Sequence, residues 1–105
     1  MSKVDSFLTL DRNLTIVAWT AGVQEIFGYE AAEILGQPVF TLVPEDQRQA
    51  AAGVLERVRS EGNVQGFHAE RLAKGGARVR IVADVAAIRD RDGVHCATQI
   101  TVRRA

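Results

Sequence analysis

Apolar residues along this chain change their spacing twice, and the changes mark where strands and helices are expected. Two short runs rich in β-branched and aromatic residues lie around 6–11 and 14–19, with the turn formers Arg12 and Asn13 between them. This pattern predicts a β-hairpin or two successive strands at the start of the chain.

Helical spacing follows the second run. After Thr20, whose hydroxyl can cap a short helix, apolar residues recur three and four positions apart until Gly28, which is placed to end it. A second short helical piece is expected over residues 30–35, before Gly36. The segment 37–43 is too apolar for a free surface loop, so it should cover a core.

A longer helix is predicted from Pro44 to Ser60. Proline loses no hydrogen bond at the first helical position, and Glu45 and Asp46 lie favourably at the positive end of the helix dipole. Apolar residues at helical spacing form one stripe along this helix. The stripe consists of Ala51, Val54, Leu55 and Val58.

The last third of the chain has the pattern of three consecutive antiparallel strands, over residues 64–72, 77–88 and 94–102. Turn sequences join them, Lys74-Gly75-Gly76 in the first hairpin and Asp92-Gly93 in the second. One face of the middle strand is entirely apolar, so that face should belong to the core. Its members are Ala77, Val79, Ile81, Ala83, Val85 and Ala87.

Together these elements predict an α+β fold, a five-stranded antiparallel sheet with short helices and one longer helix on one face. A chain of 105 residues that is 47% hydrophobic and 25% charged has the ordinary size and composition of one globular domain. We therefore expect residues 1–105 to form a single domain. No stretch approaches the roughly 20 apolar residues of a membrane span.

The formal charge sums to zero but is unevenly divided. Residues 1–53 hold seven acidic and three basic side chains, whereas residues 54–105 hold ten basic and six acidic ones. Arg78 and Arg80 alternate with apolar residues, as on the solvated face of a strand, and no basic run contains interleaved aromatic residues. Nucleic-acid contact by this chain is therefore not expected.

The single cysteine, Cys96, can form no disulfide within the chain, and the first residues lack the apolar stretch of a secretory signal. Both observations favour the reducing cytoplasm. Cys96 is expected to be a small buried hydrophobic residue, on a strand face that it shares with Val94, Ile100 and Val102.

No motif for metal binding or catalysis is found. His68 and His95 fall on different predicted strands without a third ligand at metal-binding spacing, so no metal site is expected. The sequence has no Gly-x-Ser-x-Gly motif, and its Gly75-Gly76 pair belongs to a hairpin rather than to a phosphate-binding loop. The chain is expected not to be an enzyme.

Two stretches of the sequence combine spaced glycines with apolar positions in a characteristic pattern. The first runs from Trp19 to Tyr29 and continues through Ala32-Glu33-Ile34-Leu35-Gly36 to Leu42-Val43-Pro44. The second contains Arg71, Lys74-Gly75-Gly76, the run from Ile88 to Gly93, and Ile100-Thr101. Together these stretches resemble a bacterial PAS domain, of the sensory-box family. The resemblance extends from about Phe7 to Arg103 and depends on spaced turn glycines and apolar positions.

The resemblance implies a cavity between the helices and the sheet, where PAS relatives bind small molecules. Flavin photosensors of the LOV type carry a reactive cysteine three residues after the glycine that Gly36 resembles, and this chain has Val39 there. Haem-binding relatives place an axial histidine seven residues after the proline that Pro44 resembles, where this chain has Ala51. A covalent LOV flavin and a His-ligated haem are therefore not expected, whereas non-covalent FAD or a small metabolite stays open.

Aromatic and apolar residues of the predicted elements are candidates for lining such a cavity, and the simpler alternative is that they fill a solid core. The candidates are Trp19, Phe27, Tyr29, Phe40, Leu42, Val54, Val58 and Phe67. In PAS relatives a glutamate of the short helix pairs with a basic residue of the hairpin. Glu33 and Lys74 are thus a candidate salt bridge for transmitting changes in the sheet, with a plain surface contact as the alternative.

The function implied by the resemblance is that of a sensory module in a bacterial signal-transduction protein, as in two-component systems. It would bind a small ligand, form a homodimer through its PAS surfaces, and pass the signal to an output domain. A histidine kinase, a cyclic-dinucleotide enzyme or a transcription regulator would supply that output from another segment or chain.

Two alternatives to this function stay open. One is a ligand-free module for dimerisation or protein interaction, favoured if Val82, Ala86 and Ile88 prove exposed on the outer face of the sheet. The other is a non-covalent flavin redox sensor, which would make the protein yellow.

Overall fold

The computed structural model describes residues 6–105, and the elements within them follow the order that the spacing of apolar residues predicts. The strands are β1 (Phe7–Leu10), β2 (Ile16–Trp19), β3 (Asn63–Leu72), β4 (Arg78–Arg89) and β5 (His95–Arg104). The helices are α1 (Ala21–Phe27), α2 (Ala31–Ile34), the 3₁₀ turns η1 (Val39–Leu42) and η2 (Glu45–Gln47), and the longer α3 (Arg48–Glu61).

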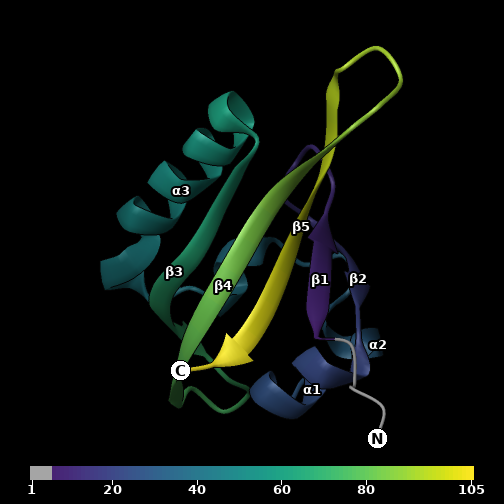
Figure 1. Cartoon of the computed structure of the whole chain (residues 1–105). Coiled ribbons are helices and arrows are strands. Elements are labelled where there is room, and N and C mark those ends of the chain that lie inside the picture. Colours follow the sequence, from purple (N-terminus) through teal and green to yellow (C-terminus); the bar gives the residue numbers. More distant parts are fainter. Residues whose placement is uncertain (1–5) are drawn as a thin grey trace, which may run out of the picture.

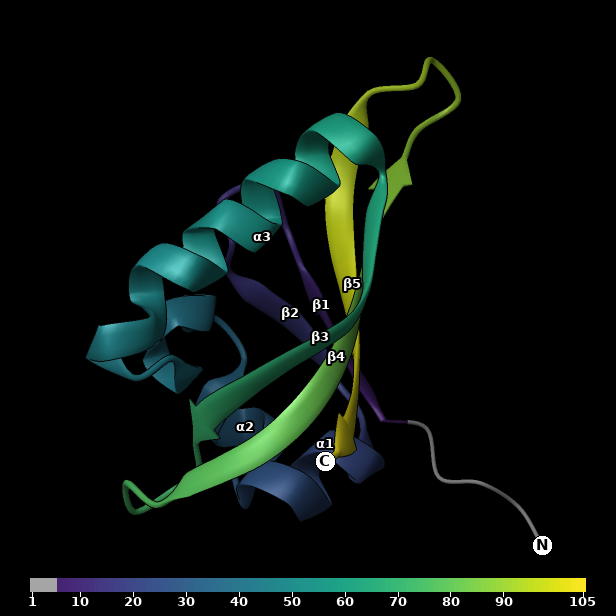
Figure 2. The same ribbon diagram turned by 60° about the vertical axis from the view of Figure 1, so that its left-hand side comes forward.

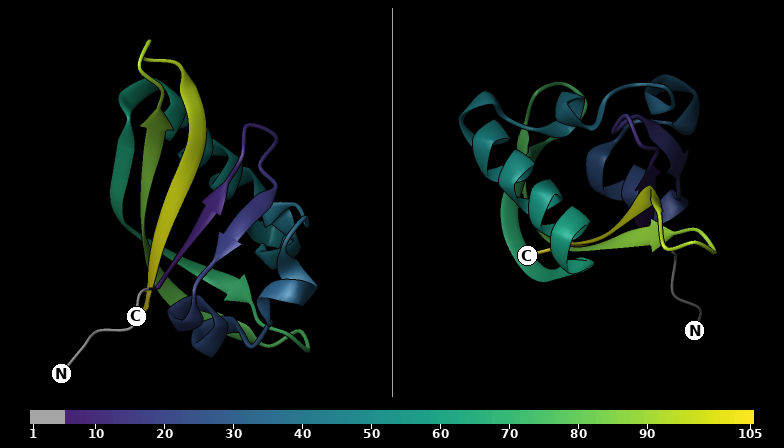
Figure 3. Two further views of the ribbon diagram at one scale, coloured as in Figure 1. Left: turned by 90° about the vertical axis from the view of Figure 1, so that its right-hand side faces the viewer. Right: turned by 90° about the horizontal axis from the view of Figure 1, so that it is seen from above.

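All five strands form one antiparallel sheet in the order β2-β1-β5-β4-β3. Strands β1 and β5 lie side by side in the middle of the sheet, although one begins the chain and the other ends it (Figure 1). The helices cover one face, and α3 packs on β3 and β4 (Figures 2 and 3). The predicted α+β architecture is confirmed.

The core lies between the helices and the inner face of the sheet. Ile81, Ala83 and Val85 are buried, and Val79 and Ala87 pack partly buried against the core, which confirms most of the apolar face predicted for the middle strand. Ala77 was wrongly included, because it is exposed in the turn before β4. On α3, the residues Ala51, Val54 and Val58 are buried and Leu55 packs beside them, as the predicted stripe requires.

A β-bulge in β3 decides which of its side chains reach that core. The pairing of β3 with β4 shifts register between Val64 and Phe67, where Gly66 adopts a φ of 66° that favours glycine. The Gly66 amide donates a hydrogen bond to Asp84 Oδ1 of β4 at 2.8 Å. Beyond the bulge the odd-numbered residues face the helices, so Phe67 and Arg71 both line the interior.

The longer helix begins later than predicted. Pro44 has an extended backbone, η2 follows it as a 3₁₀ turn, and α3 starts only at Arg48. Gln47 Oε1 accepts a hydrogen bond from the Glu70 backbone N–H at 3.0 Å, so this turn is fastened to the edge of β3. The predicted helix start at Pro44 was wrong because a contact distant in sequence holds the segment.

Thr20 precedes α1, but its hydroxyl makes no capping hydrogen bond to that helix. Instead Oγ1 accepts a hydrogen bond from the Phe7 N–H at 2.9 Å and donates one to the Phe7 carbonyl at 3.0 Å. The cap prediction was wrong because the neighbouring strand β1 engages the hydroxyl. Gly28 ends α1 with a φ of 81°, as predicted.

Cys96 is half-buried rather than buried, which corrects the sequence prediction. Its Sγ–H donates to the Ile88 carbonyl at 3.3 Å. Val94, expected on the same core face, is 49% exposed because it belongs to the β4–β5 turn that projects from the sheet (Figure 1). The buried part of the β5 face begins at Thr98.

Candidate functional site

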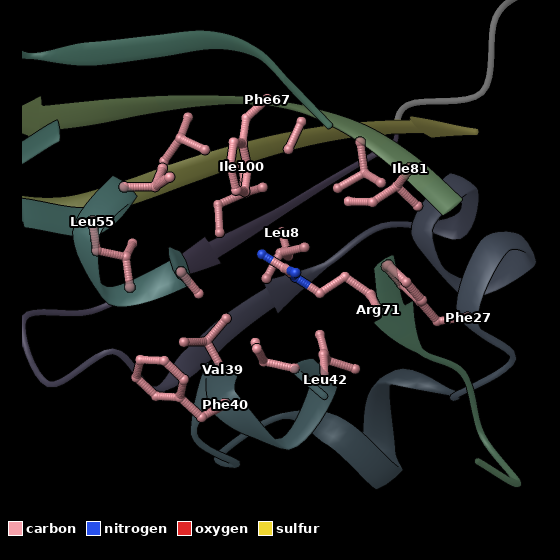
Figure 4. Close-up of a pocket in the computed structure, with 16 residues that line it drawn as sticks. Leu8, Phe27, Val39, Phe40, Leu42, Leu55, Phe67, Arg71, Ile81 and Ile100 are labelled. Atoms are coloured by element: carbon pink, nitrogen blue, oxygen red, sulfur yellow. The ribbon is translucent and has the colours of Figure 1, made fainter. Parts of the chain in front are cut away.

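A cavity of about 50 Å³ lies between α3, η1 and the inner face of the sheet. Sixteen residues line it, and all of them except Arg71 are apolar (Figure 4). They come from β1, α1, η1, α3 and the last three strands, together with Val43 between η1 and η2. The cavity therefore lies where strands and helices from both ends of the chain meet.

Five of the residues proposed from the sequence are brought together around this cavity. They are Phe27, Phe40, Leu42, Val54 and Phe67. Val39, which occupies the position of the reactive LOV cysteine, also lines it, as does Ala51 at the position of the haem histidine. The lining thus has an apolar side chain at both positions that the sequence resemblance singled out.

The other three sequence candidates, Trp19, Tyr29 and Val58, lie outside the lining. Trp19 Nε1 donates to the Tyr29 carbonyl at 2.9 Å, and its ring lies 5.9 Å from the ring of Phe27, centroid to centroid. Val58 is fully buried in the packed core. These side chains fill space or tie elements together, which is the simpler alternative that the sequence left open.

Arg71 is the lining residue that sequence reasoning missed as part of the site. Phe67 and Ala69 mark the apolar face of β3, and Arg71 continues the same alternation. A charged residue on an apolar strand face was the available signal. The Gly66 bulge made this signal hard to recognise. If the alternation before the bulge is continued, it places residues 67, 69 and 71 on the outer face of the sheet.

The Arg71 guanidinium reaches from β3 into the apolar lining (Figure 4). Its Nη1 donates to the Glu70 carbonyl at 2.8 Å and to Gln47 Oε1 at 3.3 Å. The guanidinium carbon lies 6.0 Å from the centroid of the Phe67 ring. Burial lowers the pKa of Arg71, because the protein interior solvates its positive charge less well than water does.

A chain of polar contacts leads from Arg71 to the surface. Gln47 Nε2 donates to Glu70 Oε1 at 3.2 Å, and the Glu70 carboxylate pairs with Arg78 at 3.3 Å. Arg78 also contacts Asp46 at 2.6 Å, and that hydrogen bond lowers the pKa of Asp46 and raises the pKa of Arg78. The polar end of the cavity is therefore connected to exposed charges on η2 and β4.

Glu33 of α2 and Lys74 of the β3–β4 hairpin form the salt bridge proposed from the sequence, with 2.5 Å between Oε2 and Nζ. The hydrogen bond lowers the pKa of Glu33 and raises the pKa of Lys74. The Lys74 backbone N–H also donates to the Phe27 carbonyl at the end of α1. The hairpin thus contacts both short helices, and the role of the pair in signalling stays a prediction.

A flavin does not fit this cavity as it is built. Ligand sites for molecules of that size generally enclose at least about 300 Å³ and offer several polar groups. This cavity has about 50 Å³ and one polar side chain, Arg71. Within residues 6–105, no group of three His, Cys, Asp or Glu side chains is arranged to hold a metal ion.

Membrane insertion through a helix finds no support in the part of the chain that the structure describes. None of its helices combines the length and the apolar character needed to cross a bilayer.

Comparisons with known proteins agree with this geometry. The PAS domain of a protein from Colwellia psychrerythraea superimposes with a TM-score of 0.88 at 24% identity, covering 96% of this chain and 86% of that one. The light-state structure of the blue-light photoreceptor Aureochrome1 LOV gives a TM-score of 0.81 at 19% identity, over 97% of this chain and 82% of that one. A fungal LOV domain photoreceptor gives 0.77 at 21% identity, over 96% and 74% respectively.

Comparison with curated protein sequences gave no match. A family model described as the PAS fold matches residues 4–103, which is nearly the whole chain. This match shows that the chain belongs to the PAS family, and the sheet order, the helices on one face and the cavity between them agree with it.

Proposed function

We propose that this chain is a single sensory module that binds a small ligand in the cavity described above and passes its binding state to an output domain. The observation that carries the proposal is the cavity itself, a space between helices and sheet lined by apolar side chains and one arginine. A space that a few larger side chains could fill is retained in an otherwise closely packed core. No catalytic step is assigned to the chain.

Two routes connect the cavity with the surface of the module. One is the polar chain from Arg71 through Gln47 and Glu70 to Arg78. The other is the central strand pair, because Leu8 of β1 faces Ile100 of β5 and both line the cavity. A ligand that displaces the residues of either route would also displace surface groups that an output domain or a second copy of the chain can contact.

The biological setting follows from the same proposal. We infer a bacterial signal-transduction protein of the cytoplasm, in which a histidine kinase, a cyclic-dinucleotide enzyme or a transcription regulator supplies the output. The Glu33–Lys74 pair is proposed to couple the β3–β4 hairpin to α2 during signalling. A homodimer through the outer surfaces of the sheet is the proposed assembly.

Occupancy of the cavity tests this function directly. Freshly purified protein is examined by native and denaturing mass spectrometry and by its visible absorption spectrum. A stoichiometric extra mass that disappears on denaturation is expected, and it should be absent from Ala83→Val, which places two methyl groups in the cavity. Ala86→Val, on the exposed face of the same strand, is the matched control and should keep the ligand.

A bare mass for the wild-type protein, joined with a stable dimer, would favour the interaction module instead. The outer face of β4 gives that alternative partial support. Ile88 is 38% exposed and Ala86 is exposed, but Val82 is only 6% exposed. The apolar stripe expected for a docking face is therefore interrupted. A yellow protein would favour the flavin sensor, although the size and the lining of the cavity do not suit a flavin.

A further inference from the structure

Arg71 has no counter-charge in the part of the chain that the structure describes. None of the five ion pairs within residues 6–105 includes Arg71, and the neighbouring Glu70 pairs with Arg78 instead. Its hydrogen bonds there go to two neutral oxygens, the Glu70 carbonyl and Gln47 Oε1, and both are made by Nη1. A desolvated cation without an anion is unfavourable in a protein interior, so an anion in this space would be stabilised.

The remaining donors of Arg71 are accessible. A guanidinium has five N–H donors, and within residues 6–105 those on Nε and Nη2 make no hydrogen bond to protein. In the same part of the chain, no buried polar side-chain atom lacks a partner, so Nε and Nη2 are not sealed inside packed atoms. Each therefore keeps some accessible surface, which a ligand atom can contact. One edge of the guanidinium thus has the form that binds a carboxylate with two parallel hydrogen bonds.

Size and polarity of the cavity restrict what such an anion can be. On a scale where one water needs about 10–15 Å³, a cavity of about 50 Å³ admits a ligand of only a few non-hydrogen atoms. Every lining side chain other than Arg71 is apolar, so the rest of the ligand should be hydrocarbon. A second charge or a hydroxyl-rich body would find no partner among these side chains.

We propose that the cavity binds a short-chain monocarboxylate of about three or four carbons, with its carboxylate on the free edge of Arg71 and its alkyl chain among Val39, Leu42 and Leu55. This inference rests on the proposed function and names the ligand class for the same cavity. Gln47 acts as the positioning residue, because its Oε1 holds Nη1 and so fixes the orientation of the guanidinium.

Titrations followed by amide NMR test the proposal, with sodium butyrate, its neutral isostere butyramide, and sodium phosphate as probes at constant ionic strength. Butyrate should shift the amides of cavity residues, and butyramide should shift them much less. Arg71→Gln should weaken butyrate binding at least about tenfold. Arg91→Gln, an exposed arginine of the β4–β5 turn, is the matched control and should bind as the wild type does.

Four results would overturn the carboxylate site. Equal binding of butyrate and butyramide, or unchanged binding in a folded Arg71→Gln variant, would show a cavity that takes ligands without using the charge. Preference for phosphate would show an anion site without an alkyl requirement. Absence of any shift in cavity amides would remove the short-chain ligand.

The ligand-binding function itself is judged separately, by the occupancy of the purified protein. If Arg71→Gln proves unfolded, Arg71→Lys keeps a charge but loses the planar two-donor edge, and its butyrate affinity should also fall.

Discussion

The inner face of the sheet has two regions that are built differently. Toward β2 and the short helices, Leu10, Ile16, Val23 and Ile34 are between 0% and 1% exposed. Toward α3 and β3, several cavity-lining residues are only partly buried, and a space remains between them. These are Phe40, Leu55, Phe67 and Ile100. We call the first the closed region and the second the cavity region.

The difference shows how a small domain can combine stability with the cavity proposed here to bind a ligand. The closed region joins β1 and β2 to α1 and α2 through complete burial, which stabilises the fold. The cavity region leaves apolar surface incompletely packed and contains the desolvated Arg71, and both features reduce stability. Substitutions in the two regions are therefore expected to have different effects.

The largest effect is expected from Ile16→Ala in the closed region. Removing a fully buried side chain should lower the free energy of unfolding by about 2–5 kcal/mol. Leu55→Ala in the cavity region should lower it by only about 1–2 kcal/mol, because Leu55 is partly exposed and borders existing space. Urea denaturation measures both, with Val17→Ala, 51% exposed on the same strand as Ile16, as control. Equal losses for Ile16 and Leu55 would contradict the division.

A smaller loss is expected from Gln47→Ala, at the polar edge of the cavity region. The variant leaves the Glu70 amide and Arg71 Nη1 without one acceptor, which should lower the free energy of unfolding by about 1–2 kcal/mol. Hydrogen exchange at the Glu70 amide should also become faster. Gln49→Ala, exposed on α3, is the control and should change neither quantity. Unchanged exchange at Glu70 would mean that this contact does not hold η2 to β3.

A modest gain is expected from filling the cavity. Ala83→Val adds two methyl groups on the inner face of β4 and should raise the free energy of unfolding by about 0.5–1 kcal/mol. The same change should abolish ligand binding. Thermal unfolding with and without ligand measures both effects. A destabilised variant would show that the space is smaller or more rigid than the structure indicates.

The smallest effect is expected from the Glu33–Lys74 pair, which lies in neither region. Its hydrogen bond holds the Glu33 pKa below the ordinary value of 4.5, so its stabilising contribution is present above that pH. The contribution should disappear as the pH falls through the lowered folded-state pKa. Glu33→Gln should therefore unfold slightly more easily than wild type at neutral pH and equally easily in strong acid, as thermal melts can show. Because both groups are exposed, a large difference at neutral pH would require another role for Glu33.

Much of this fold could be predicted from the sequence because two simple periods govern it. The alternation from Val79 to Ala87 and the helical stripe from Ala51 to Val58 each reflect a face turned to the core, and the structure confirms both. The errors occur where a contact distant in sequence overrides the local pattern. Thr20 binds Phe7 rather than its own helix, and Gln47 binds β3 rather than extending α3.

The cavity could be predicted only in part, for a different physical reason. Apolar residues that border a space and apolar residues that fill one have the same sequence signal, so Phe27 and Val58 could not be distinguished. Whether space remains depends on the summed volumes of side chains from several elements. The position of Arg71 in the cavity lining was not predicted, because the Gly66 bulge changes the face of the sheet on which Arg71 lies.

The central position of β1 beside β5 has a mechanical consequence. Phe7 pairs with Thr101 and Leu10 with Thr98, so the start of β1 and the end of β5 lie at the same end of the sheet. Tension applied between these two ends would break the hydrogen bonds between β1 and β5 one after another. It would not load all of them at once, as a shearing force would. Leu8 and Ile100 form an early rung of this ladder and also border the cavity. A small force would therefore disturb the cavity before it disturbed the closed region.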